Sequence, residues 1–267
     1  MIPGGLVSIT FRQLEPKAII DLIKQAGLTS IEWGGDVHCP HGDVQTARKV
    51  GELTREAGLT PAVYGSYYRT APVHKEVPAF AEVLDAAQAL GAGAIRVWAG
   101  DLGSQQSDDA HRRSVIADAQ RIADRAAEEG VELIFEYHGG TLTDTHEGAA
   151  TLIHDIHRPN VRSGWQPVPT RTHEQNLADL SDLIERDILG SVHVFQWTAG
   201  EKGVVRHPLR EGENDWSEYL RLLAEAKLPS PTQPLEPPAM IEFVKDNEPD
   251  QFLDDANALR RWLDAMG

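Results

Sequence analysis

Four polar side chains interrupt short apolar runs that are typical of buried β-strands. Glu136 lies in VELIFEYH, Gln166 in VRSGWQP, His193 in SVHVFQW and Glu242 in AMIEFV. Burying an ionised carboxylate without a partner is very costly, so we expect these side chains to face a counter-charge or a metal ion. Two carboxylates, one imidazole and one amide oxygen are suitable ligands for a hard or borderline divalent cation. The pattern therefore predicts one metal site that is assembled from four strands.

Each of these residues also has a simpler explanation when it is taken alone. A strand glutamate can form a structural ion pair with a lysine or arginine, and a lone strand histidine is more often a hydrogen-bonded core residue than a ligand. Gln166 can hydrogen-bond beside Trp165, and its amide carries no charge, which makes it the weakest of the four. Two carboxylates near the ends of different strands favour the metal site.

Eight apolar runs, separated by amphipathic segments, indicate the elements that position these residues. Glycines such as Gly27 and Gly91 end helical segments before the next run, where a left-handed residue is common. The alternation predicts a single domain over residues 1–267, folded as a closed (β/α)8 TIM barrel. An open doubly wound sheet is the alternative, but the RQLEP segment after the first run lacks a glycine-rich phosphate loop. The runs cover 6–11, 30–33, 60–68, 94–99, 131–138, 161–167, 191–197 and 239–244.

Two segments depart from this rhythm. Residues 198–214 are expected to form a long polar loop after the seventh strand, on the face where barrel enzymes build their active sites. Residues 227–239 are rich in proline and are expected to form a rigid connection at the opposite face.

The composition excludes several kinds of partner and location. The net charge of the 267 residues is −16, which argues against nucleic acid, because phosphate backbones require clustered Lys and Arg. No apolar run approaches the roughly 20 residues that cross a bilayer. The single Cys39 forms no internal disulfide, and the N-terminus lacks the features of a signal peptide. We therefore expect a cytoplasmic protein without nucleic-acid or membrane partners.

Over essentially its whole length, the chain resembles the sugar phosphate isomerase/epimerase family of xylose isomerase-like TIM barrels. The segments that carry the resemblance are IEWGGDVHCPHGD, IFEYHGGTLTDT, VHVFQW, PLREGENDW and MIEFV. The resemblance implies one divalent metal ion (Mn, Mg, Co or Zn), held by Glu, Asp, His and Glu from strands five to eight. Glu136, His193 and Glu242 match three of these positions. Gln166 stands where the family usually has Asp, and Pro169 replaces a following substrate-binding His, as in a subgroup with a WQP segment.

The resemblance also implies a reaction. A sugar or sugar phosphate would lose a proton beside its carbonyl group, and the metal would stabilise the resulting enediolate. Glu136 and Glu242 would move the protons, which gives epimerisation or isomerisation. An inosose-type dehydration of a cyclic polyol ketone and a non-catalytic sugar-binding barrel are the alternatives. Cleavage of damaged DNA, the reaction of a distant relative, is disfavoured by the acidic charge.

Four further residues are expected to contact a small-molecule carbohydrate. His138 shares a strand face with Glu136, since side chains two apart point the same way, and Trp165 offers an apolar plate. Arg206 lies in the polar loop, and His38 is expected at the rim of the site. Trp33 is a second candidate plate, although packing explains it better. The sequence leaves the oligomeric state open, a homo-oligomer included.

Overall fold

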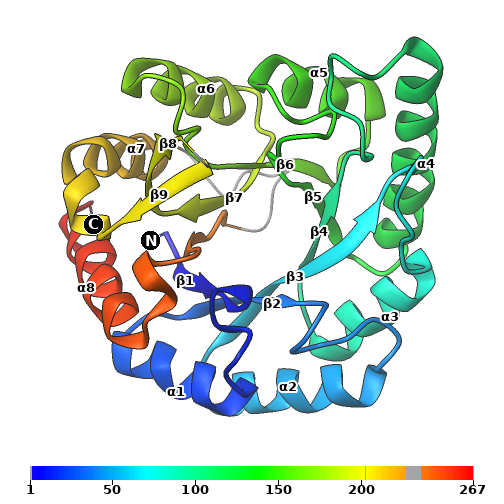
Figure 1. Cartoon of the computed structure of the whole chain (residues 1–267). Coiled ribbons are helices and arrows are strands. Elements are labelled where there is room, and N and C mark those ends of the chain that lie inside the picture. Colours follow the sequence, from blue (N-terminus) through cyan, green and yellow to red (C-terminus); the bar gives the residue numbers. More distant parts are fainter. Residues whose placement is uncertain (1, 202, 227–235, 267) are drawn as a thin grey trace.

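Eight parallel strands close into a barrel in the computed structural model, which describes residues 2–201, 203–226 and 236–266 (Figure 1). Their order around the barrel is β1-β10-β7-β6-β5-β4-β3-β2, so sequence neighbours pair and the last barrel strand closes on the first. The predicted (β/α)8 fold is confirmed. The strands are β1 (Gly4–Val7), β2 (Ser30–Gly34), β3 (Thr60–Arg69), β4 (Ala94–Trp98), β5 (Glu132–Phe135), β6 (Val161–Trp165), β7 (Leu189–Val194) and β10 (Ala239–Ile241).

Helices surround the barrel, and local capping explains where several of them begin and end. Thr172 and Gln175 form a reciprocal capping box at the start of α6, which satisfies two backbone N–H groups. Gly27 and Gly91 end α1 and α3 with left-handed φ angles of 69° and 81°, as the sequence predicts. The helices are α1 (Pro16–Ala26), α2 (Val44–Glu56), α3 (Phe80–Leu90), α4 (Asp109–Ala127), α5 (His146–Ile156), α6 (His173–Glu185), α7 (Glu213–Glu225) and α8 (Pro249–Met266). Among the described helices, none combines the length and apolar character that a membrane-spanning segment needs.

The strands separate two apolar regions because their side chains alternate between the two faces. The larger region lies between the barrel and the helices, and a small cluster that includes Val63, Ala94, Ile134 and Met240 lies inside the barrel. Residues two positions beyond these four share their inward orientation. At three of those positions polar side chains, Arg96, Glu136 and Glu242, meet inside the barrel, at the carboxyl ends of the strands. We call this end the mouth.

Two predicted segments differ in the structure. The first run, expected as a strand over 6–11, ends as β1 at Val7 and continues as a 3-10 helix, Ser8–Phe11. The prediction of a polar loop over 198–214 was wrong in part. The antiparallel strands β8 (Gln196–Gly200) and β9 (Gly203–His207) form a hairpin there, followed by a 3-10 helix, Leu209–Gly212, and the first turn of α7. The proline-rich connection falls mostly outside the described residues.

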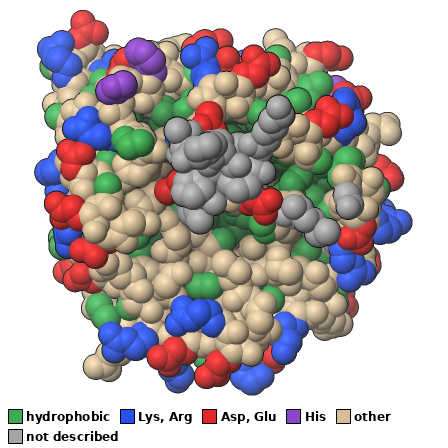
Figure 2. Space-filling model, turned by 180° about the vertical axis from the view of Figure 1, so that it is seen from behind, with side chains coloured by type: hydrophobic (Ala, Val, Ile, Leu, Met, Phe, Trp, Pro, Cys, Tyr) green, Lys and Arg blue, Asp and Glu red, His purple; other side chains and the backbone are tan. Residues whose placement is uncertain are grey.

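The face of the molecule opposite the view of Figure 1 carries mixed charges. Figure 2 shows acidic and basic side chains interspersed around its edge, with apolar side chains nearer its centre. On the described part of this face, Lys and Arg do not gather into a continuous patch.

Candidate metal centre

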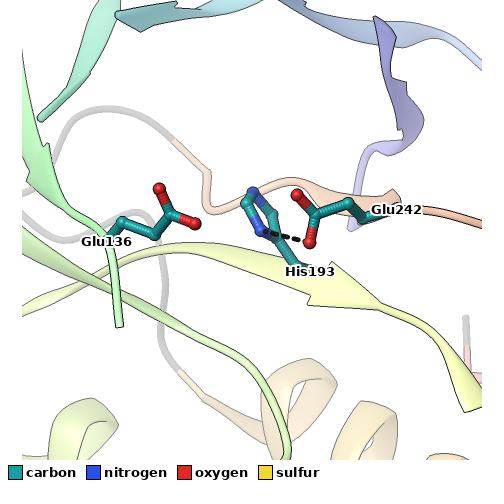
Figure 3. Close-up of side chains that lie close together, drawn as sticks. All are labelled: Glu136, His193 and Glu242. Atoms are coloured by element: carbon teal, nitrogen blue, oxygen red, sulfur yellow. Dashed lines mark ion pairs between the residues drawn. The ribbon is translucent and has the colours of Figure 1, made fainter. Parts of the chain in front are cut away.

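Three of the four predicted metal ligands lie together at the mouth of the barrel (Figure 3). Glu136, His193 and Glu242 are all buried, and each offers one ligand atom within 4.8 Å of the ligand atoms of the other two. Glu136 directly follows β5, His193 lies in β7, and Glu242 directly follows β10. These strands are distant in the sequence, and the closed barrel brings their inward-facing side chains to one place.

Gln166, the fourth predicted ligand, directly follows β6 and lines the same small cavity as Glu136 and His193. The side chain is half-buried. Its amide makes no hydrogen bond to any other described residue, so its oxygen is available to a ligand in the cavity. The structure therefore places Gln166 at the same cavity as Glu136 and His193, without a hydrogen-bond partner among the described residues.

Two charged residues that the sequence analysis did not single out complete the centre. Glu32 on β2 and Arg96 on β4 are buried, with relative exposures of 0% and 3%. Glu32 Oε1 accepts from Arg96 Nε at 2.7 Å, and Glu32 Oε2 lies 3.3 Å from His193 Nε2. Arg96 also donates to Glu136, and His193 Nδ1 lies 3.3 Å from Glu242 Oε2. The five side chains form a continuous chain of alternating charge.

The sequence does contain a signal for these two residues. Glu32 stands in SIEW and Arg96 in AIRVWA, and each is the one charged residue of its run. A charged side chain within an apolar run is also the feature that drew attention to Glu136 and Glu242. Applied to every strand, the same criterion finds all the charged members of the network.

Mutual electrostatics keep Glu32, Arg96 and His193 charged in spite of their burial. Burial raises the pKa of Glu32, but the charge of Arg96 and a hydrogen bond from His193 lower this pKa to about 2. Burial likewise lowers the pKa of His193, yet the charges of Glu242 and Glu32 raise it well above its usual value. Burial also lowers the pKa of Arg96, while Glu136 and Glu32 raise it. Glu32 therefore stays ionised at neutral pH.

The carboxylates of Glu136 and Glu242, at the two ends of the charged network, are oriented so that they could bind a cation. Arg96 and the indole Nε1 of Trp98 both donate to Oε2 of Glu136, and no described residue hydrogen-bonds Oε1. Glu242 directs Oε2 toward His193, and its Oε1 also lacks a hydrogen-bond partner among the described residues. Both glutamates thus keep one oxygen for a ligand.

The charge of the network also fits a divalent cation. The carboxylates of Glu32, Glu136 and Glu242 face the single guanidinium of Arg96, with His193 between them. When His193 is neutral, as a metal-ligating imidazole must be, two negative charges remain uncompensated. A divalent ion would balance them, and carboxylate oxygens with one imidazole nitrogen are ligands that such ions accept.

Two of the predicted substrate contacts lie at the rim of the mouth. His138 is exposed, and its ring centroid lies 5.2 Å from that of Trp98. Arg206 belongs to β9 of the hairpin rather than to a loop. Its guanidinium lies 4.7 Å from the ring centroid of Phe243, and its Nη1 donates to Oδ1 of Asn247 at 2.7 Å. Phe243 adjoins Glu242, so Arg206 stands beside the ligand cluster.

The prediction that the Trp165 ring contacts a substrate does not agree with its placement. Its ring lies in the layer between the barrel and the helices, 5.1 Å from the ring centroid of Tyr219 and 6.2 Å from that of Trp216, both on α7. Neighbouring side chains in a strand point to opposite faces. Trp165 borders the same small cavity as Gln166, but its ring packs against α7.

His38 is also a structural residue in this fold rather than an open rim group. Its side chain is buried, with Nδ1 at 3.0 Å from Ser8 Oγ and Nε2 at 3.2 Å from the backbone oxygen of Leu14. Both ring nitrogens therefore have partners within the protein. Trp33, which packing explains better at the sequence level, is fully buried and donates to Thr54 on α2.

A closed parallel barrel with a buried, carboxylate-rich centre at its mouth defines the molecule as a TIM barrel with its candidate site where such enzymes react. A family model described as a xylose isomerase-like TIM barrel matches residues 20–262, and the chain belongs to this family. No curated protein matches the chain.

Solved structures with similar folds include proteins of several activities. The probable 3-DHS dehydratase of Bacillus anthracis has 17% identity and a TM-score of 0.76, over 97% of this chain and 99% of that one. D-psicose 3-epimerase with D-fructose has 17% identity and a TM-score of 0.68, over 98% and 99%. A xylose isomerase-like protein of Mycobacterium smegmatis in complex with magnesium has 13% identity and a TM-score of 0.68, over 100% and 98%. At these identities the likeness establishes the fold alone.

Proposed function

We propose that this protein is a divalent-metal-dependent isomerase or epimerase of a sugar or sugar phosphate. The observation that carries the proposal is the convergence of Glu136, His193 and Glu242, whose ligand atoms all lie within 4.8 Å of one another at the mouth of a TIM barrel. Membership of the xylose isomerase-like family and the presence of an epimerase among the similar structures support it. Gln166 is the proposed fourth ligand.

The cation would supply Lewis acidity, which stabilises the negative charge that develops on a substrate deprotonated beside its carbonyl group. Glu136 and Glu242 approach the cavity from β5 and β10, which β6 and β7 separate in the barrel. One carboxylate removes the proton and the other returns a proton on the opposite face, which inverts the carbon centre. Return of the proton to the neighbouring carbon gives isomerisation instead.

The residues around the carboxylates position them and the substrate. Arg96 and Trp98 fix Oε2 of Glu136, and Oε1 has no hydrogen-bond partner among the described residues. His138 and Arg206 stand at the rim, where their nitrogen atoms can bind hydroxyl or phosphate oxygens of the substrate. The proposed substrate is therefore a small, oxygen-rich carbohydrate held between the rim and the cation.

Dehydration of a cyclic polyol ketone is the second candidate. A probable dehydratase is among the structures with this fold. The same first proton removal serves both reactions, and the second proton then goes to a departing hydroxyl group, which leaves as water, in place of returning to carbon. Loss of water changes the mass of the product, whereas isomerisation and epimerisation do not, so mass spectrometry distinguishes the two.

The proposal is tested with the metal-loaded protein in deuterated water, with a panel of ketoses, ketose phosphates and cyclic polyol ketones. We expect an isomeric product that carries deuterium at the carbon beside the carbonyl group. Glu242→Gln should lower the rate at least 100-fold, and Glu132→Gln, at the other end of the barrel, should leave it nearly unchanged. Full activity of Glu242→Gln contradicts the mechanism. A loaded protein that turns over no member of the panel indicates a sugar-binding barrel.

A further inference from the structure

Glu32 reaches the centre from a strand that carries none of the proposed ligands. In the barrel, β3 and β4 separate β2 from β5, while β1 and β10 separate it from β7. The side chain is inaccessible to solvent, yet each of its two oxygens has a charged or ionisable partner, Arg96 on one side and His193 on the other. Burying this carboxylate costs desolvation free energy, and the contacts with both partners are needed to offset that cost.

The backbone between the two strands leaves room for this contact. Gly65 on β3 lies between Glu32 on β2 and Arg96 on β4. A Cβ atom at position 65 would lie 2.6 Å from Glu32 Oε1 and 3.1 Å from Arg96 Nη2. Any larger residue at this position would push the two charged groups apart. The ion pair between Glu32 and Arg96 therefore requires a glycine at position 65.

The contact with His193 decides which ring nitrogen faces the ligands. Glu32 lies 3.3 Å from Nε2, and Nδ1 lies 3.3 Å from Glu242. Metal-ligating histidines commonly donate their other N–H to a carboxylate, which fixes the tautomer and the ring orientation. With Nε2–H donated to Glu32, the lone pair of the neutral ring is on Nδ1, toward Glu136 and Glu242.

The contact with Arg96 acts on the other side of the centre. Arg96 donates to Glu136, so its position determines where the free oxygen of Glu136 lies. Arg96 also places a positive charge next to the cavity, and without a counter-charge it would repel a cation. Glu32 holds the guanidinium at 2.7 Å and compensates that charge.

We propose that Glu32 is a positioning residue of the metal centre, which presents His193 Nδ1 and Glu136 Oε1 together to the cation. The inference rests on the metal binding of the proposed function. Glu32 does not touch the ion itself; it acts through His193 and Arg96. The proposal adds a residue from β2 to a centre whose ligands come from β5 to β10.

The substitution Glu32→Gln tests this role because an amide cannot satisfy both partners. Its one oxygen accepts from Arg96, and its NH2 group then faces Nε2 of His193. The neutral ring must accept at Nε2 and carry its proton on Nδ1, the atom that faces the cation. We expect the affinity for Mn²⁺, titrated into the metal-stripped full-length protein by calorimetry, to fall about 10- to 100-fold.

Glu132→Gln is the matched control. Glu132 is also a buried glutamate inside the barrel beside an arginine, with 3.8 Å between its Oε1 and Arg162 Nη2, but it lies at the opposite end of β5 from Glu136. Its Mn²⁺ affinity should stay within about twofold of the wild type. In the protein loaded with diamagnetic Mg²⁺, where a ligating His193 ring is neutral, its ¹⁵N shifts provide a second readout: Nε2 carries the proton in the wild type, and this signal should shift in Glu32→Gln.

The outcomes separate this inference from the proposed function. If the wild type binds Mn²⁺ and folded Glu32→Gln binds it within threefold, the positioning role is overturned and the metal function stands. If the wild type binds no divalent ion, both fail. Should Glu32→Gln not fold, Glu32→Asp carries the test, because it keeps the charge beside Arg96 but shortens the reach to His193. An affinity at least fivefold weaker supports the role, and an unchanged affinity overturns it.

Discussion

At the scale of single residues, the centre depends on which atom of each side chain is already engaged. Glu136 uses one oxygen for Arg96 and Trp98, and Glu242 uses one for His193, so each retains a free oxygen. Gln166 differs because its amide has no partner among the described residues and carries no charge. A substitution at Gln166 therefore tests its contribution to cation binding most directly, because it breaks no hydrogen bond to another described residue.

Gln166→Asp places an additional carboxylate beside the cavity. We expect the Mn²⁺ affinity to rise by roughly tenfold, equivalent to about 1.4 kcal/mol, because a charged oxygen binds a divalent ion more strongly than an amide oxygen. Calorimetric titration of the metal-stripped protein measures the change. Asn257→Asp, an exposed position on α8, adds the same charge far from the mouth and should have no comparable effect. An unchanged affinity of Gln166→Asp shows that residue 166 does not approach the ion.

At the scale of elements, a single carboxylate ties the end of the β8–β9 hairpin segment to α8. Asp255 on α8 is buried and accepts from the backbone N–H of Leu209, which follows β9, and from the side chain of Gln251, both at 2.8 Å. This contact holds the segment that carries Arg206. Burial raises the pKa of Asp255 to about 6, despite the opposing effect of these hydrogen bonds.

The raised pKa of Asp255 predicts that this group stabilises the fold less as the pH rises. Because the folded-state pKa is above that of the unfolded chain, the contribution of this group is fully present below about pH 4 and is lost as the pH rises through about 6. Asp255→Asn removes this loss, so it should raise the free energy of unfolding at pH 7.5 by on the order of 1–2 kcal/mol. At pH 4 the variant and the wild type should differ little. Urea titrations at both pH values measure the difference, and an equal effect at both would contradict the assignment.

At the scale of the whole molecule, the barrel encloses charges from five different strands. The strands that position these charges lie all around the barrel rather than along one side. The five residues are Glu32, Arg96, Glu136, His193 and Glu242. A cation at their centre would link opposite walls in the folded state only. Its binding free energy therefore adds to the stability of the whole fold.

Divalent metal should accordingly stabilise the protein against heat. At a free concentration of about 100 times Kd, Mn²⁺ adds about 2.7 kcal/mol, which raises Tm by roughly 5–10 °C in a protein of this size. Differential scanning calorimetry with and without EDTA measures the increment. Glu242→Gln, which removes a ligand charge, should lose most of it, whereas Glu132→Gln should keep it. An identical Tm of the wild type with and without excess Mn²⁺ would exclude a site in the folded barrel.

The amino-acid sequence by itself determined the barrel and most of its centre, for a local reason. Apolar runs mark the strands, glycines such as Gly27 end the helices, and a charged residue inside an apolar run identifies a side chain that needs a buried partner. The alternation within a strand also assigns Trp165 and Gln166 to opposite faces, although only the packing of Trp165 against Tyr219 made that distinction evident.

Only the tertiary structure decided which partner each buried charge has. Glu32 contacts Arg96, 64 positions away, and His193, 161 positions away, because the closed barrel brings distant strands face to face. The same closure brings His38 next to Ser8. A local antiparallel pairing, rather than the closure, replaces the expected loop with the hairpin that carries Arg206. A local pattern can show that a group needs a partner, but distances across a closed barrel are set by the pairing of all its strands.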